Sequence, residues 1–374
     1  MKFVMPRKAF LAALKTVQPA VSRRATLPIL SGIKLDAAKD RLTMEATDLE
    51  TVIATTIATD VEKPGVVVAP ASALIKAVGA LSDPMIEVTT EDLRLTVRCG
   101  KRTVTVQGFS SEDWPSSRIV DIGTSALATV DARALADALA RVVVCASTDE
   151  ARPVLTGVAL FMDGKAQAMD LVATDSYRLG AVRVQVRDCG EVPSEPMIIP
   201  ARTARALAKH LRKARGEVRI HVDDGPAGRL VAVRFGDDTW SMRAIEGQFP
   251  DWRQILGGQG GARLELDADE TSSALKTMAA VRSNGTPVRL SLGERCTIAM
   301  SEKDVGEVTE SLGSATYAAD GVGAIEIGFN ADYLADAIRF IGEGRTEVHI
   351  RDALKPAIFE YADRRYALMP VRLS

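Results

Sequence analysis

Apolar residues at the i, i+4 and i+7 positions of one buried helix face open each third of the chain. The positions are Phe10, Leu14 and Val17, then Leu135, Leu139 and Val142, and more weakly Leu275 and Ala279. A second helix is predicted in each third directly after Pro70, Pro200 and Asn330, since proline suits a first helical turn. Its buried positions are Leu74, Val78 and Leu81, then Leu207 and Leu211, then Leu334, Ile338 and Ile341. Asp131 is expected to cap the helix that follows it.

Between these helices, apolar and polar residues alternate with the period of strands that have one face in water. The alternating positions are Leu93, Leu95 and Val97, then Val104 and Val106, with the final strands at 358–361 and 366–369. Tight turns are predicted at Asp163-Gly164 and at Asp224-Gly225. The pattern predicts an α+β fold in which two helices pack on one face of an antiparallel sheet in each third.

Short motifs repeat at intervals much longer than the 20 to 50 residues of solenoid repeats. Residues 27–33, LPILSGI, recur as RPVLTGV at 152–158. Ala46-Thr47-Asp48 recurs as Ala173-Thr174-Asp175. One domain fold is therefore used three times, and we expect domains at residues 1–124, 125–257 and 258–374.

Composition is that of an ordinary globular protein, with 47% hydrophobic and 26% charged residues in a chain of 374. No apolar stretch reaches the ~18 residues that span a bilayer, and the N-terminus lacks the apolar segment of a secretion signal. The four cysteines lie far apart, so we expect reduced thiols in a cytoplasmic protein. A net charge of −2 means that any basic surface must be local.

No catalytic or metal site is predicted. The three histidines do not have metal-ligand spacing, and no glycine-rich loop with lysine is present to hold a phosphate or nucleotide cofactor. The repeated Thr-Asp pair has the residue types of a catalytic acid, but a strand-end turn held by the aspartate is the better interpretation. A hydrolase stays open as an alternative, without residues to name.

One basic surface stands out from the rest of the sequence. Arg205, Lys209 and Arg212 lie at i, i+4 and i+7 on the helix after Pro200, and Arg202 flanks them. A solvated helix face is the commoner fate of such a charge run, and nucleic acid is the alternative. No aromatic residues lie among these charges, so contact with phosphates and without base stacking fits best.

Several motifs together resemble the bacterial DNA polymerase III beta subunit, the sliding clamp family. They are Met1-Lys2-Phe3, residues 27–30, residues 46–50, residues 173–179, Phe249-Pro250-Asp251-Trp252 and residues 369–373. The resemblance implies a non-catalytic, head-to-tail homodimeric ring of six clamp domains, with helices lining a pore for duplex DNA. It implies no cofactor, and partners that include the replicative polymerase, the clamp loader and repair polymerases.

The resemblance also implies three sets of functional residues. Those implied for a peptide-binding pocket are Leu155, Thr174, Ser176, Tyr177, Arg178, Leu179, Pro250, Ile255, Leu368, Met369, Pro370, Val371 and Arg372. Those expected to face DNA are Arg24, Arg133, Arg141, Arg202, Arg205, Lys209 and Arg212. Those expected at the dimer interface are Val104, Val106, Val281 and Arg282.

The sequence departs from the family pattern at several of these positions. Ser176-Tyr177 stand where many relatives have Gly-His, Gln254 replaces a basic residue, and Arg282 stands where an aliphatic residue is expected. Two alternatives to a replicative clamp stay open. One is a duplicate clamp specialised for repair or antibiotic resistance, and the other is a ring-shaped scaffold that does not thread DNA.

Overall fold

The structure is a computed structural model that describes residues 1–22, 27–115, 126–225, 228–257, 260–283, 285–319, 321 and 323–373. The chain divides into two compact units. Unit 1 comprises Met1–Ala136, Val186–Val192 and Arg205–Ala244, and unit 2 comprises Asp137–Gln185, Pro193–Ala204 and Ile245–Ser374. Each unit therefore takes part of the middle third of the sequence. The expected boundary at residues 124 and 125 lies outside the described residues.

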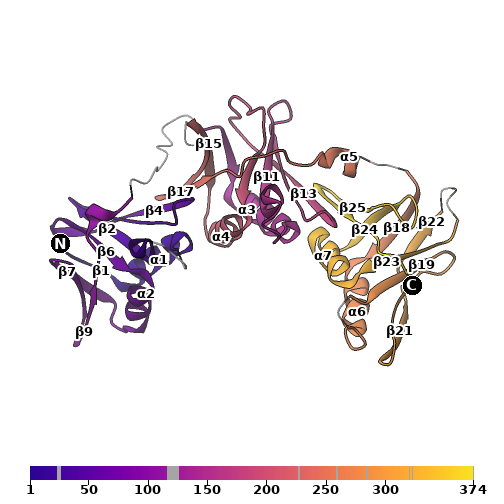
Figure 1. The fold of residues 1–374 in the computed structure, drawn as a ribbon, viewed down its shortest axis with the longest axis horizontal. Coiled ribbons are helices and arrows are strands. Elements are labelled where there is room, and N and C mark those ends of the chain that lie inside the picture. The colour runs from indigo at the N-terminus through magenta and orange to yellow at the C-terminus, as the bar shows by residue number, and fades with distance from the viewer. Residues whose placement is uncertain are drawn as a thin grey trace. The chain divides into compact units, whose positions relative to one another are not determined.

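Two helices of ten or eleven residues occur in each third of the described chain (Figure 1). They are α1 (Arg7–Val17), α2 (Ala71–Ala80), α3 (Ala132–Val142), α4 (Ala201–Leu211), α6 (Ala268–Met278) and α7 (Ala331–Ile341), and a short α5 spans Trp252–Leu256. The predicted starts after Pro70, Pro200 and Asn330 are confirmed. The two prolines end the preceding strands and do not enter the first helical turn. Asp131 caps α3 as predicted, because its Oδ1 accepts from the N–H groups of Arg133 and Ala134 at 3.0 and 2.9 Å.

The predicted apolar faces are buried in five of these helices and wrong in α6. In α6, Leu275 is half-buried and Ala279 is exposed. The buried face there carries Thr271, together with Ala268, Ala274 and Met278. Thr271 tolerates burial because its hydroxyl donates to the Asp267 carbonyl at 2.7 Å, which satisfies its polar group. The two predicted positions thus each lie one residue after a buried one, Ala274 and Met278.

Unit 1 contains an eight-stranded and a five-stranded antiparallel sheet. In spatial order, the first is β10 (Ala128–Asp131), β15 (Glu217–Gly225), β16 (Gly228–Phe235), β17 (Asp238–Arg243), β4 (Thr51–Ala58), β3 (Arg41–Thr47), β2 (Gly32–Ala38) and β6 (Gly65–Pro70). The second is β5 (Asp60–Lys63), β1 (Lys2–Pro6), β7 (Met85–Glu91), β8 (Arg94–Cys99) and β9 (Arg102–Gln107). Leu95 and Val97 are buried on β8 as expected, whereas Leu93 precedes the strand and is exposed.

Unit 2 contains a nine-stranded and a four-stranded antiparallel sheet. The first is β14 (Met197–Pro200), β11 (Gly157–Asp163), β12 (Ala168–Thr174), β13 (Arg178–Gln185), β26 (Arg364–Leu368), β25 (Ala357–Tyr361), β24 (Arg345–Ile350), β18 (Ala262–Asp267) and β22 (Thr316–Ala318). The second is β21 (Gly306–Ser311), β20 (Thr297–Glu302), β19 (Pro287–Leu292) and β23 (Ile325–Asn330). The strands predicted at 358–361 and 366–369 are β25 and β26.

One of the two predicted tight turns is confirmed. Asp163 ends β11, and its Oδ1 accepts from the Ala166 N–H at 3.0 Å to form the connection to β12. The other prediction is displaced, because β15 continues through Asp224 to Gly225, which pairs with Gly228 on β16, so the hairpin connection follows Gly225 and does not lie at Asp224-Gly225. Asp224 instead pairs with the Arg229 guanidinium across the ladder, at 2.6 Å. That cross-strand contact favours extended backbone at a residue type that usually marks turns.

Each repeated LPILSG-type motif forms a short 3-10 helix followed by a closely packed glycine. The two 3-10 helices are Pro28–Ser31 and Pro153–Thr156. A Cβ on Gly32 would lie 2.5 Å from Val68 Cγ1, and one on Gly157 would lie 2.5 Å from Ile198 Cγ2. The glycine recurs in the motif because the neighbouring strand in the sheet, β6 or β14, packs too closely at this point for any side chain.

Candidate functional site

Two matching turns close the hairpins β3–β4 and β12–β13. In the first, Thr47 Oγ1 accepts from the Leu49 N–H at 3.0 Å, and Asp48 Oδ1 accepts from the Thr51 N–H at 2.8 Å. The second turn, residues 174–178, repeats both hydrogen bonds at 3.1 and 2.9 Å. Its third residue also matches, because Leu49 and Ser176 have positive φ angles of 77° and 79°. The interpretation of the Thr-Asp pairs as strand-end turns is confirmed.

The second turn differs from the first because it ends in an arginine that contacts distant segments. Arg178 Nε donates to Asp175 Oδ2 at 2.9 Å, Nη1 donates to the Asp336 carboxylate, and Nη2 donates to the Val144 carbonyl at 2.6 Å. The guanidinium carbon lies 4.2 Å from the centre of the Tyr333 ring. Burial lowers the pKa of Arg178, but the acidic groups around it outweigh burial, so the net shift of the pKa is upward.

The C-terminal tail leaves β26 beside this turn. The Met369 N–H donates to the Tyr177 carbonyl at 2.9 Å, and the Val371 N–H donates to the Gly328 carbonyl at 2.8 Å. Tyr177 is 62% exposed, Met369 39% and Val371 38%. Turn and tail thus present large apolar side chains to solvent on a backbone that hydrogen bonds hold in place. Such a surface is suited to binding a partner.

An apolar cluster lies beneath the strands β13 and β26, which carry the turn and the tail. Leu179 and Ala367, which pair across β13 and β26, pack with Phe249, Trp252 and Leu256, and Ile255 lies against the same cluster. The residues predicted for the pocket therefore fall into three groups within unit 2. Buried are Leu155, Thr174, Leu179 and Leu368; half-buried are Arg178, Pro250, Ile255 and Pro370; exposed are Ser176, Tyr177, Met369, Val371 and Arg372.

Sequence reasoning missed three polar partners of this site. Arg152 Nη1 donates to Ser176 Oγ at 2.8 Å, and Asp336 and Tyr333 on α7 hold Arg178. Asp336 lies 158 residues from Arg178, so no local pattern connects them. The one available signal was the arginine itself, because the first repeat has threonine at the matching position.

The basic residues expected to face DNA lie mostly exposed on helix surfaces. Arg133 on α3 is exposed, as are the four on or after α4, namely Arg202, Arg205, Lys209 and Arg212. Arg141 is half-buried, and its Nη1 donates to the carbonyls of Arg339 and Phe340 at 3.0 and 2.6 Å. It therefore caps the C-terminal end of α7, where a cation is favoured. Arg24 lies outside the described residues.

The residues expected at the dimer interface lie at or near two sheet edges. β9, which carries the half-buried Val104 and Val106, ends the five-stranded sheet of unit 1. β21 ends the four-stranded sheet of unit 2, and a Cβ on its Gly306 would lie 3.6 Å from Val281 Cγ1. Arg282 pairs with Asp332 at the start of α7, Nη1 to Oδ1 at 2.7 Å.

Comparison with known proteins covers the whole length of the chain. Family models described as the N-terminal, central and C-terminal domains of the DNA polymerase III beta subunit match residues 1–118, 129–251 and 253–372. The chain belongs to this family. A beta sliding clamp from Caulobacter vibrioides is 30% identical over 384 residues, and one from Pseudomonas aeruginosa is 27% identical over 387, both covering 100% of each chain.

Solved clamp structures share the fold. A sliding clamp from Bartonella birtlesii, described as bound to griselimycin, superposes with a TM-score of 0.89 at 26% identity. The DNA polymerase III subunit beta from Pseudomonas aeruginosa superposes with a TM-score of 0.87 at 26% identity. Each comparison covers 100% of both chains. The chain therefore has the three-domain clamp fold.

As a member of the beta subunit family, the chain is a DNA sliding clamp and not an enzyme. A clamp is a processivity factor, so its sites bind partners and catalyse no reaction. Burial raises the pKa of the Cys145 thiol, which favours its protonated form. Among the described residues, no helix has the length and apolar content needed to cross a membrane.

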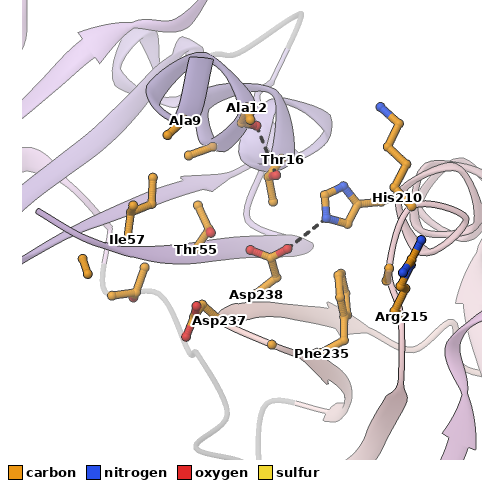
Figure 2. Close-up of a pocket in the computed structure, with 16 residues that line it drawn as sticks. Ala9, Ala12, Thr16, Thr55, Ile57, His210, Arg215, Phe235, Asp237 and Asp238 are labelled. Carbon is orange, nitrogen blue, oxygen red and sulfur yellow. Dashed lines mark hydrogen bonds and ion pairs between the residues drawn. The ribbon is translucent and has the colours of Figure 1, made fainter. Parts of the chain in front are cut away.

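A cavity of about 510 Å³ lies in unit 1 between α1, β4, the end of α4 and the β16–β17 turn. Figure 2 shows His210 and Asp238 pointing toward each other across it, with His210 Nε2 2.9 Å from Asp238 Oδ2. The His210 ring centre lies 5.2 Å from that of Phe235 and 5.8 Å from that of Trp240. No sequence pattern indicated this cavity, because its lining comes from four separate segments.

The matching place in unit 2 is filled differently. Phe340 is the tenth residue of α7, as His210 is of α4, and its ring centre lies 5.2 Å from that of Tyr366. Arg364 opens β26, as Asp238 opens β17, and donates to the Ile341 carbonyl. With Arg141 on the neighbouring carbonyls, two guanidinium groups occupy the end of α7. The two units thus have similar elements, but the end of α4 contacts β17 through a histidine–aspartate pair, whereas the end of α7 is held by two arginines.

Proposed function

We propose that two copies of this chain form a head-to-tail ring that encircles duplex DNA without reading its sequence. The replicative polymerase, the clamp loader and repair polymerases would bind to the turn and tail at residues 174–179 and 368–372. The match of the whole chain to the three domains of the beta subunit family carries this proposal. We further propose the domain limits 1–124, 125–257 and 258–374, and a cytoplasmic location.

The two sheet edges support a head-to-tail dimer. Lys101 and Arg102 make the β9 edge basic, while Glu307 and Glu310 make the β21 edge acidic. Pairing β9 of one copy with β21 of the other would join opposite charges and satisfy two open rows of backbone groups. Pairing like edges would place like charges together. We propose Val104, Val106 and Val281 as the apolar part of this contact, with Arg282 held by its own chain.

Simple geometry supports a pore that is wide enough for DNA. Twelve helices of ~10 Å diameter need a circumference of ~120 Å, which leaves ~28 Å clear inside. Basic residues on these helices would meet phosphates, although the whole chain carries a net charge of −2. Non-specific contacts alone give dissociation constants of only ~10⁻⁴ to 10⁻⁶ M. Retention would therefore come from closure of the ring, and weak contacts would permit sliding.

The ring is tested by loading the protein onto nicked circular DNA and then raising the salt concentration. We expect retention on the circle at a salt concentration that dissociates phosphate contacts, and loss once the circle is cut. Equal, salt-sensitive loss from circular and linear DNA contradicts a closed ring. The matched variant replaces Arg205, Lys209 and Arg212 together with alanine, and it should load poorly if these residues face DNA. Unchanged loading would favour a scaffold that does not thread DNA.

The docking site is tested with a labelled peptide from the clamp-binding segment of the replicative polymerase. Deleting residues 369–374 should abolish peptide binding while the native mass in solution stays that of a dimer, since the tail bonds to β23, at the opposite edge of the four-stranded sheet from β21. Griselimycin, which is bound to the Bartonella clamp, is a second probe. Peptide affinity that is unchanged by the deletion would refute the assignment of the tail.

A further inference from the structure

The repeat inside the chain separates what shapes the docking turn from what holds it in position. The turn at residues 47–51 has the same side-chain and backbone hydrogen bonds as the turn at 174–178. It also holds the following segment in the same way, because the Arg243 N–H donates to the Glu50 carbonyl at 2.8 Å, as Met369 does to Tyr177. Yet Thr51 stands where the second turn has Arg178. The turn therefore forms without an arginine.

What Arg178 adds is a connection between three segments of unit 2. Its guanidinium joins the turn, through Asp175, to the 3-10 helix Val143–Cys145 through the Val144 carbonyl and to α7 through Asp336. The Tyr333 ring covers one face of the group. Because the Met369 N–H binds the Tyr177 carbonyl, the start of the tail is fixed by the same connection.

The guanidinium has little left to offer a bound peptide. All three of its nitrogens donate within the chain, and the side chain is 11% exposed. Charge-assisted hydrogen bonds of this kind are the strong ones in proteins, so the group keeps these partners when a ligand binds. The resemblance implied Arg178 as a residue of the peptide-binding pocket, and the geometry assigns it a supporting part there.

We propose that Arg178 is a positioning residue of the docking site, which holds the turn and tail against α7 and does not contact the peptide. This inference rests on the proposed function of that site. Without the connection, the turn would still fold into the same shape, but it would open more often and move relative to the apolar cluster around Leu179. A site that is correctly placed for only a fraction of the time binds more weakly by that fraction.

The test compares Arg178→Thr, which copies the first repeat, with the wild-type protein. Peptide dissociation constants are measured by fluorescence anisotropy, with association and dissociation rates from stopped flow. We expect a dissociation constant about 10-fold higher, mostly from slower association, because the competent arrangement is less populated. Arg178→Lys should recover part of the affinity. Arg365→Thr is the matched control, since Arg365 lies on β26 and pairs with Glu360 on the sheet surface, and it should bind within twofold of wild type.

A double-mutant cycle with Asp336→Asn separates positioning from contact. Asp336 also pairs with Arg339, so Arg178→Thr does not leave Asp336 without a partner, and in Asp336→Asn the Arg178 guanidinium keeps Asp175 and the Val144 carbonyl. If Arg178 acts through Asp336, the double variant should bind no more weakly than Arg178→Thr alone. Fully additive losses would mean that Arg178 contacts the peptide itself and would overturn the inference. An Arg178→Thr variant that binds like wild type would overturn it too.

Hydrogen exchange gives a readout that does not need a peptide. The Tyr177 and Met369 amides should exchange about 10-fold faster in Arg178→Thr, while the Arg243 amide in the other repeat should not change. If wild type fails to bind the peptide but these amides respond, the proposed function is wrong and the positioning stands. If wild type binds and the amides do not respond, the positioning is wrong and the function stands.

Discussion

Arg133 and Arg141 lie on the same helix and offer a matched pair of substitutions. The resemblance expected both to face DNA, but the structure leaves Arg133 exposed and engages Arg141 with the end of α7. Methionine at either position keeps most of the side-chain stem and removes the charge. The two variants should therefore separate a loss of stability from a loss of phosphate contact.

The expected magnitudes follow from the contacts. Hydrogen bonds from a charged group contribute about 1.5–3 kcal/mol each when buried. Of the two bonds from Arg141 to the end of α7, the one to the Phe340 carbonyl, at 2.6 Å, is part-buried and the other is exposed. Arg141→Met should therefore lower the free energy of unfolding of unit 2 by about 1.5–2 kcal/mol. Arg133→Met should stay within about 0.5 kcal/mol, as surface substitutions usually do.

Two assays distinguish the variants. Unfolding in urea, monitored by hydrogen exchange of the α7 amides, reports the stability of unit 2. Anisotropy of a short labelled duplex at several salt concentrations reports the number of phosphate contacts, and the loss of one contact reduces the slope of log K against log salt by ~0.9. We expect Arg133→Met to reduce the slope and Arg141→Met to leave it unchanged. An Arg141→Met variant with a reduced slope and an unchanged unfolding midpoint would refute the reasoning.

Four further substitutions test the local structure. Asp131→Ala removes the cap of α3 and should cost about 1 kcal/mol in urea unfolding. Gly157→Ala places a Cβ 2.5 Å from Ile198 Cγ2 and should cost about 1–3 kcal/mol, whereas Gly79→Ala, with open space around it in α2, should stabilise the chain by up to about 1 kcal/mol. The hydrogen bond from Arg282 lowers the pKa of Asp332, so this pair stabilises the fold above the unfolded pKa of ~3.9 and the effect is lost as the pH falls through the lower folded value. The urea unfolding midpoints of Asp332→Asn and wild type should therefore lie closer together at pH 3 than at pH 7. An equal difference at both pH values would contradict this assignment.

The elements that local chemistry determines could be predicted from the sequence. Pro70, Pro200 and Asn330 marked the starts of three helices, and the Thr47-Asp48 and Thr174-Asp175 pairs marked two turns, since each feature depends on a few neighbouring residues. Predictions failed where a distant or polar partner decided the outcome. The Thr271 hydroxyl bond allowed a polar residue into the core of α6, and the Arg229 guanidinium kept Asp224 in a strand.

The candidate site was predictable in its composition and not in its connections. The turn and the tail were both found, because their motifs recur or resemble a family. The interactions that hold them together join residues far apart in the chain, as Arg178 does with Asp336 and Arg141 does with Phe340. Such pairs leave no periodic signal. Comparison of the repeats identifies these arginines once the structure is known. Thr51 stands in the first repeat where the second has Arg178, and Thr16 stands where it has Arg141, and a threonine side chain is uncharged and too short for such contacts.

The eight-stranded and nine-stranded sheets each combine strands from two of the three repeats. In the first, β4 of the first repeat pairs with β17 of the second, and in the other, β13 of the second repeat pairs with β26 of the third. A gene fragment that encodes the first third alone would leave β4 with a bare row of amides and carbonyls, and one that encodes the last third alone would do the same to β26. Unpaired strand edges of this kind pair with strands from other molecules. Shortened products of this gene should therefore aggregate in the cell, and we expect the three domains to be stable only within the whole chain.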